Sequence, residues 1–347
     1  MLIQQPSSRH RFIRSASILA LSIAVSAHAA EKGFTADKTP DGGVLVRHDG
    51  KPFAGYVIGE ANKPYLFPIF GPTGKQMTRA FPMQKVEGEQ TDHYHHRGIL
   101  FGHQDINGFD SWMERGSATQ VNRNEIALLP DDKLSEKQKA AVAKMGTEKH
   151  IAFKEIKANA DNAVIIEEID YIGGDGKRSV TEIRRITFRA DGEMRTIDWD
   201  QELTAKDGEV TFGDKKDAGL SIRVPSSMAV DTKKGGRIVT STGITDKDAW
   251  SKRAPWVDYS GPVDGETLGI AMLNHPSSFR HPTSWHVRTY GLFAANPFGT
   301  LDKADPNGPH TLKQGEKFIL RHRFVFHKGD EKTANIAAAY ERYSKEK

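Results

Sequence analysis

Short strand-like segments, separated by Gly, Asp and Asn turns, run through most of this chain and constrain its fold more than any other feature. Gly173-Gly174-Asp175-Gly176 and Asp191-Gly192 join three of these segments, and both are turn sequences that reverse a strand tightly. We therefore predict a mainly β fold. The predicted strands are 44–46, 56–58, 163–172, 180–189, 194–203, 220–224, 268–273, 285–293 and 318–326.

The segment 194–203 alternates between apolar and acidic residues, as a strand does when one side of its sheet covers a core. The apolar set is Ile197, Trp199, Gln201 and Leu203, and the acidic set is Asp198, Asp200 and Glu202. Helix is scarce: 134–145 is typical of a solvated surface helix and 333–343 of a short C-terminal helix. One large β-domain over residues 31–347 is the simplest organisation.

Residues 1–30 are interpreted as a signal peptide. Arg9, Arg11 and Arg14 are followed by the short apolar run 18–25 and by small residues around Ala29, where cleavage is expected. The apolar run is too short to span a bilayer, so no membrane insertion is predicted. The mature protein is expected in the periplasm or outside the cell.

Composition excludes several classes of protein. The chain has no cysteine, so its own core must hold it together without disulfides. The formal net charge is +4, but residues 1–30 carry three of the 49 Lys and Arg and none of the 45 Asp and Glu, which leaves about +1. No basic stripe with interleaved aromatic residues occurs, so nucleic acid is not an expected partner.

Histidines gather in two short stretches, 91–108 and 274–299. Imidazole can accept or donate a proton near neutral pH, so a dense group of histidines indicates acid–base chemistry or metal binding. If residues 92–97 were extended, His93 and His95 would point to one side and His96 to the other. The candidate catalytic residues are His95, His96, His275 and Glu202. The candidate ligand-binding residues are Arg97, His103, Trp285, His286, Arg288 and Asn296.

A divalent metal is an alternative use of the same residues. His-x-His on one face of a strand can supply two zinc ligands, and the set would be His93, His95 and His275. The sequence has no HExxH motif and no cysteine ligands, so spacing alone does not decide between a bound metal and no cofactor.

The histidine stretches resemble conserved blocks of the PmoA-like family, a group of secreted bacterial proteins. The resemblance rests on Asp92 to Gly98, on 213–224, on 256–262 and on His275-Pro276 through to Asn296-Pro297-Phe298-Gly299. The chain departs from that pattern at Tyr94, where the family often has proline, and at Asn274, where it often has aspartate.

A remoter similarity joins residues 65–72, the His-Arg-Gly segment and Trp112 to aldose-epimerase (galactose mutarotase-like) proteins. It implies a large antiparallel β-sandwich with a ligand cleft, and a small-molecule carbohydrate as partner. The leading hypothesis is therefore a carbohydrate-active enzyme of epimerase, lyase or hydrolase type. A histidine-ligated metalloenzyme and a non-catalytic carbohydrate-binding module remain alternatives, and the oligomeric state stays open.

Overall fold

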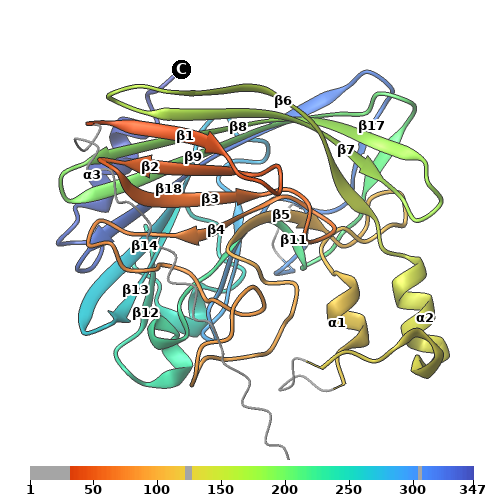
Figure 1. Cartoon of the computed structure of the whole chain (residues 1–347), viewed down its shortest axis with the longest axis horizontal. Helices are drawn as coiled ribbons and strands as arrows, with labels where there is room; N and C mark the ends of the chain where they lie inside the picture. The colour runs from red at the N-terminus through yellow and green to blue at the C-terminus, as the bar shows by residue number, and fades with distance from the viewer. Residues whose placement is uncertain (1–31, 122–126, 304–306) are drawn as a thin grey trace, which may run out of the picture.

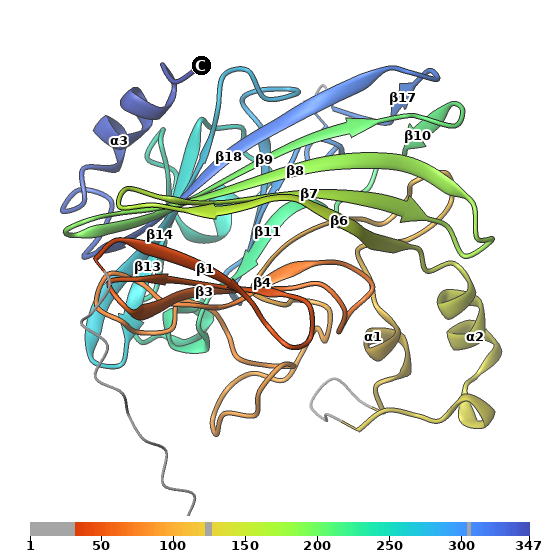
Figure 2. The same cartoon turned by 45° about the horizontal axis from the view of Figure 1, so that its top comes forward.

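The computed structural model describes residues 32–121, 127–303 and 307–347, so the predicted signal peptide lies outside the described residues. Within this part of the chain, two eight-stranded sheets and one two-stranded ribbon form, and all pairings between their strands are antiparallel. Figures 1 and 2 show the two large sheets packed face to face. The predicted mainly β, antiparallel sandwich is confirmed.

The first sheet runs in the order β1 (Phe34–Lys38), β2 (Val44–His48), β3 (Lys51–Val57), β4 (Tyr65–Ile69), β5 (Ile99–His103), β11 (Ala218–Arg223), β16 (Leu292–Asn296) and β15 (Ser284–Val287). The second runs in the order β12 (Arg237–Thr240), β13 (Trp256–Val263), β14 (Glu266–Asn274), β18 (Lys317–Lys328), β9 (Met194–Thr204), β8 (Arg178–Asp191), β7 (Ala163–Ile172) and β6 (Thr147–Ala158). The ribbon pairs β10 (Val210–Phe212) with β17 (His310–Leu312).

Helices are few and short, as predicted. The α-helices are α1 (Arg115–Thr119), α2 (Glu136–Ala143) and α3 (Ile336–Tyr343), and single 3-10 turns cover Asp131–Lys133, Ser226–Met228, Val230–Thr232 and Asp246–Ala249. The predicted helices 134–145 and 333–343 correspond to α2 and α3, each shorter at its N-terminal end. Among the residues that the structure describes, no helix has the length and apolar character needed to cross a membrane.

One strand prediction is wrong. Residues 285–293 form two strands, β15 and β16, joined by a turn at 288–291, and not one continuous strand. Gly291 has φ +105° and donates its N–H to the carbonyl of Arg288, and Arg288 donates to Leu292. A glycine can adopt this backbone conformation without strain, and it closes the hairpin.

The main core lies between the two large sheets. Phe53 of β3 meets Phe188 of β8 edge to face, with ring centroids 5.6 Å apart. In β9 the alternating residues Ile197, Trp199 and Leu203 are all fully buried, as the sequence pattern predicted. A strand side chain alternates between faces, so Asp198, Asp200 and Glu202 necessarily point away from this core.

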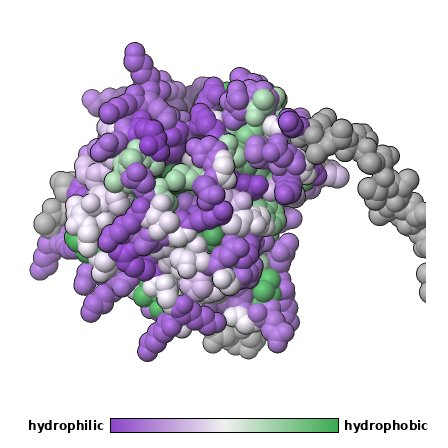
Figure 3. All heavy atoms as spheres, turned by 90° about the vertical axis from the view of Figure 1, so that its left-hand side faces the viewer, coloured by the Kyte–Doolittle hydropathy of each residue, from purple (hydrophilic) through white to green (hydrophobic). Residues whose placement is uncertain are grey.

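Each sheet also has a partly covered outer face. On the first sheet, Tyr65, Leu100 and Leu292 form a second apolar cluster with Trp112, which comes from the loop after β5. On the second sheet, α3 packs over β14 and β18 and leaves the outer face of β6 to β9 without a helix (Figure 2). The face drawn in Figure 3 is mainly hydrophilic, with apolar residues in small separate groups.

Charged side chains are also buried between the sheets. Arg184 donates to both oxygens of Glu182 (2.6 and 3.0 Å) and to Glu148 (3.4 Å). Tyr56 receives a hydrogen bond from Arg184 (3.0 Å) and donates one to Glu167. We call these five residues the inner ionic cluster. All are buried, and Arg184 is the one guanidinium in this cluster beside three acidic side chains.

Burial raises the pKa of Glu148 from 4.5 to about 8, against the attraction of Arg184. Because the pKa of Glu148 is higher in the folded protein than in the unfolded chain, the folded protein binds this proton more tightly. The resulting stabilisation is complete below pH 4.5 and is lost as the pH rises to about 8. We expect the free energy of unfolding of the native protein to fall by ~5 kcal/mol relative to Glu148→Gln over this interval, at ~1.4 kcal/mol for each pKa unit. Urea titrations of both proteins at several pH values measure the difference, and parallel curves would contradict it.

Candidate functional site

The first histidine stretch is a turn and not a strand, which corrects the expected extended geometry. His93 has φ +48°, and His96 donates its N–H to the carbonyl of His93 (3.0 Å). The turn gathers the rings of His93, His95 and His96 instead of sending them to alternate faces. Gly98 follows with φ +33°, and a Cβ there would lie 1.8 Å from the carbonyl oxygen of Leu66, so the chain needs glycine where it enters β5.

Two buried arginines hold this turn in place. Arg79 donates to the carbonyl of His93 (2.9 Å) and to the carboxylate of Asp92 (2.7 Å). Arg223, at the end of β11, donates to the same carboxylate (2.9 Å). Burial opposes ionisation of Asp92, but its hydrogen bond with His93 and the charge of Arg223 hold its pKa below the usual range. The carboxylate therefore stays charged and fixes the turn.

The rings of His95 and His96 lie close together, with centroids 4.4 Å apart and planes at 76°. His93 stacks parallel to His96 (4.7 Å) and to Tyr290 (5.0 Å). Trp112 meets both His95 and His96 edge-on. The cluster is thus held by rings as well as by hydrogen bonds.

Burial lowers the pKa of both His95 and His96 well below 6.5, and the positive groups around them lower it further. Both rings are therefore neutral at neutral pH. Arg223 donates to Nδ1 of His96 (3.2 Å), so that nitrogen carries no proton and Nε2 carries the N–H. Nδ1 of His95 bonds Oγ of Ser117 on α1 (2.7 Å), which leaves its Nε2 for a ligand.

These rings line a cavity of about 290 Å³, which we call the histidine pocket. Its wall combines imidazoles, amides, hydroxyls, an ammonium and a carboxylate, so it offers many hydrogen-bonding groups to a small polar ligand. The lining residues are His93, Tyr94, His95, His96, Gln104, Met113, Ser117, Gln120, Lys216, Asp217 and Tyr290.

The second histidine stretch reaches this pocket through Tyr290 and through one loop. Nδ1 of His286 donates to the carbonyl of Lys216 (2.6 Å), and the amide of Asn296 donates to the same carbonyl (2.9 Å). Asp217 follows directly and faces the pocket. His286 and Asn296, both predicted to bind ligand, are therefore placed to position Lys216 and Asp217 and are absent from the pocket wall.

Three further predicted ligand-binding residues are engaged in the protein interior. Nε of Arg97 donates to both oxygens of Glu114 (3.1 Å each). His103 is fully buried, and its Nδ1 accepts the N–H of Asp105 (2.9 Å). Trp285 is fully buried and donates to a backbone carbonyl. The fourth, Arg288, lies over the ring of Tyr290 at 5.8 Å and is thus beside the pocket wall.

His275 and Glu202 lie apart from the histidine pocket. His275 packs against Tyr343 of α3 (5.0 Å), and its Nδ1 accepts from Arg321 on β18 (3.3 Å). Glu202 projects from the outer face of the second sheet and pairs with Lys317 (2.8 Å). Neither residue belongs to the pocket wall, so the structure does not support them as partners of His95 and His96.

The proposed metal ligands His93, His95 and His275 do not come together. Across residues 32–121, 127–303 and 307–347, no group of three or more His, Asp or Glu side chains has an arrangement that could hold a metal ion. In the histidine pocket, Nδ1 of His93 and of His95 already bond Asp92 and Ser117.

Several residues of the pocket were not singled out from the sequence: Gln104, Ser117, Lys216, Asp217 and Tyr290. Lys216 and Asp217 lie within the block 213–224 that carried the family resemblance, so that block held a usable signal. Ser117 lay in no motif, and only the packing of α1 against the histidine turn brings it to His95.

The fold and site together define an antiparallel β-sandwich with a polar, histidine-lined pocket on the outer side of its first sheet. Over residues 43–341 the chain matches a family described as a family of unknown function (DUF6807), and it belongs to that family. No curated protein matches it in sequence.

Among solved structures, the chain is similar to galactose 1-epimerase from Lactobacillus acidophilus NCFM, with a TM-score of 0.35 and 10% identity, over 87% of this chain and 100% of that one. It is also similar to the GH36 alpha-galactosidase AgaA from Geobacillus stearothermophilus, with a TM-score of 0.38 and 9% identity. That match covers 86% of this chain and 40% of the galactosidase. A galactose mutarotase related enzyme from Lactobacillus acidophilus matches with a TM-score of 0.27 and 11% identity, over 51% of this chain and 72% of that one. Such low TM-scores support no argument about function.

Proposed function

We propose that this protein is a carbohydrate-active enzyme that binds a sugar or sugar derivative in the histidine pocket and moves a proton on it with His95 and His96. The observation that carries the proposal is the pair of neutral, largely buried imidazoles in contact on the wall of a polar cavity. Neutral imidazole accepts a proton and also donates a hydrogen bond, so two such rings suit reversible proton transfer.

The two rings have different tasks in this mechanism. We assign His95 the tautomer in which Nδ1–H donates to Ser117, and its Nε2 is then the base that removes a proton from the sugar. Nε2–H of His96, fixed by Arg223, donates to the oxygen on which negative charge develops. His95 then returns the proton to a different atom of the sugar, so the sugar is isomerised and no net proton is gained or lost.

The remaining pocket groups would bind the hydroxyls of the sugar. Asp217 accepts hydrogen bonds, whereas Gln104 and Gln120 both donate and accept them. Trp112 lies behind the two histidines, fully buried, and keeps water from their inner sides.

The proposal also includes export of the protein and its relationship to the PmoA-like family. The segment 1–30 predicts export to the periplasm or beyond, and the resemblance of the histidine blocks to the PmoA-like family is consistent with secretion. Neither supplies a substrate.

The test is a panel of aldoses, keto-sugars and glycosides incubated with the purified protein in D₂O and followed by proton NMR. We expect at least one sugar to be converted or to exchange a proton for deuterium faster than in buffer. Conversion that needs His95 and His96 supports the proposal. A panel with neither conversion nor exchange would overturn the enzymatic role, and binding without conversion would point instead to a carbohydrate-binding module.

A further inference from the structure

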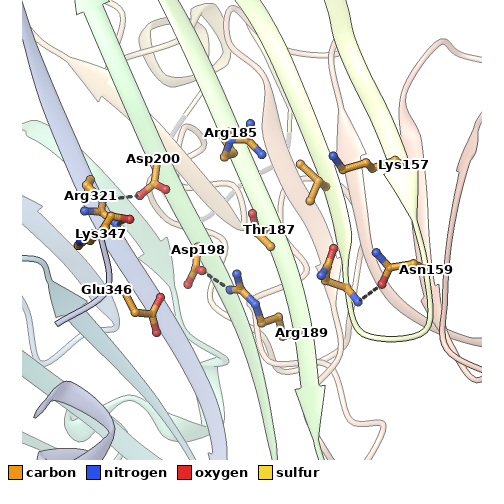
Figure 4. A pocket seen from close by; sticks show the side chains of 12 residues that line it. Lys157, Asn159, Arg185, Thr187, Arg189, Asp198, Asp200, Arg321, Glu346 and Lys347 are labelled. Carbon is orange, nitrogen blue, oxygen red and sulfur yellow. Dashed lines mark hydrogen bonds and ion pairs between the residues drawn. The ribbon is translucent and has the colours of Figure 1, made fainter. Parts of the chain in front are cut away.

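A second cavity, of about 460 Å³, lies on the outer face of the second sheet (Figure 4). We call it the outer-face pocket. Charged side chains from β6, β8, β9 and β18 line it, together with amides of the loop between β6 and β7 and the last residues of the chain. The lining includes Lys157, Asn162, Arg185, Thr187, Asp200 and Arg321.

Strand register sets a row of alternating charge across this pocket. Asp200 of β9 lies opposite Arg321 of β18 on one side and opposite Arg185 of β8 on the other. Side chains directly opposite on one face of an antiparallel sheet have Cβ atoms ~4.5–5.5 Å apart. Figure 4 shows Arg185 and Asp200 projecting from neighbouring strands into the same space. The pocket therefore offers a cation and an anion side by side.

Asp200 is only partly satisfied. Its Oδ1 lies 3.6 Å from Nε of Arg321, which is beyond a hydrogen bond, and this oxygen is buried without a hydrogen-bond partner among the described residues. By contrast, the neighbouring Asp198 accepts from both Arg323 and Arg189. A buried carboxylate oxygen left unpaired is costly, and the Asp200 side chain is still 29% exposed, so the exposed part of the carboxylate is suited to accept a hydrogen bond from a ligand.

Arg185 is the corresponding donor. Within the described part of the chain it has no hydrogen bond or ion pair, and it is exposed to the pocket. The other two arginines of the wall are engaged: Arg189 with Asp198, and Arg321 with Asp200 and Ser277. A planar guanidinium binds a carboxylate through two parallel hydrogen bonds, so Arg185 is suited to hold an anionic ligand group.

We propose that the outer-face pocket binds an acidic sugar, with the carboxylate of the ligand on Arg185 and its hydroxyls on Asp200 and Asn162. A hydroxyl fits Asp200 better than an ammonium group does, because the charge of Arg321 beside it repels a second cation. The cavity volume lies in the range of small-molecule sites. The site does not depend on the function proposed for the histidine pocket.

The test is isothermal titration of the full protein with D-glucuronate, and with D-glucose and inorganic sulfate as probes of the sugar ring and of the charge alone. We expect glucuronate to bind at least tenfold more tightly than either probe. Arg185→Gln should weaken glucuronate binding at least tenfold, and Asp200→Asn should weaken it several-fold. Arg342→Gln, which changes an exposed arginine of α3 outside the pocket, is the matched control and should bind as the native protein does.

The outcomes separate this site from the histidine pocket. Unchanged glucuronate binding in His96→Gln supports the proposal. Failure of the native protein to bind glucuronate, equal affinity for glucose or for sulfate, or unchanged binding in Arg185→Gln would each overturn it. Loss of glucuronate binding in His96→Gln together with retention in Arg185→Gln would also overturn it, because the acidic sugar would then occupy the histidine pocket.

Discussion

Replacing Arg184 by methionine is expected to lower the free energy of unfolding by ~3–5 kcal/mol, the usual cost of removing one partner from a buried ion pair. Arg184 is fully buried and is the guanidinium that serves both Glu182 and Glu148. Methionine keeps much of the side-chain volume but leaves the Glu182 carboxylate without its cation and removes the hydrogen bond to Glu148. Chemical denaturation at neutral pH measures the change.

The adjacent residue supplies a matched control. Arg185 lies on the same strand but points to the opposite, exposed face, so Arg185→Gln should change the free energy of unfolding by less than ~0.5 kcal/mol. A loss of under ~1 kcal/mol in Arg184→Met would show that the inner ionic cluster rearranges without it. The same comparison establishes that Arg185→Gln is a folded protein for the titrations with glucuronate.

Replacing either histidine of the catalytic pair by glutamine is expected to lower kcat/KM by ~10²–10⁴-fold for any sugar that the protein converts, the usual contribution of a general acid or base. Glutamine retains polar atoms and cannot accept a proton from the sugar at neutral pH. His48→Gln is the control, because His48 lies on β2 outside the histidine pocket. Equal rates in the control and in His95→Gln would refute the assigned role of His95.

The pH dependence of the native protein's activity is a second test of the role of His95 as the base. Burial lowers the pKa of His95, so the base stays unprotonated until the pH falls well below 6.5. Activity limited by His95 should therefore be retained at pH 6 and lost only in more acidic solution. An acid limb centred at or above pH 6.5 would contradict a buried histidine as the base.

Much of the second sheet was predictable because strand periodicity is local. The predicted strand 163–172 coincides with β7, and the alternation around Trp199 placed the correct residues of β9 in the core. The prediction of one continuous strand at 285–293 was wrong. Both strands of this hairpin are buried, so the residues of the turn are the one signal in the sequence that separates them.

The histidine pocket was only partly predictable. The density of histidines in 91–108 correctly indicated a place where titratable groups gather, and His95 and His96 lie there together. His275 was grouped with them because it also lies in a histidine-rich stretch, yet it folds against α3. Position along the chain does not indicate which part of 274–299 contacts the histidine turn at 92–97. In the structure, Tyr290 is the one residue of 274–299 that lines the histidine pocket.

The sequence by itself determined the antiparallel β-architecture, the short helices and the residues around which the candidate site forms, because side-chain alternation and turn chemistry act between near neighbours. The tertiary structure alone decided that residues 92–97 form a turn, that Arg97 forms an ion pair with Glu114 and that Asp217 faces the histidines. The physical reason is that the hydrogen bonds that hold this turn come from Arg79 and Arg223, which lie 14 and 131 residues along the chain from the groups they bind.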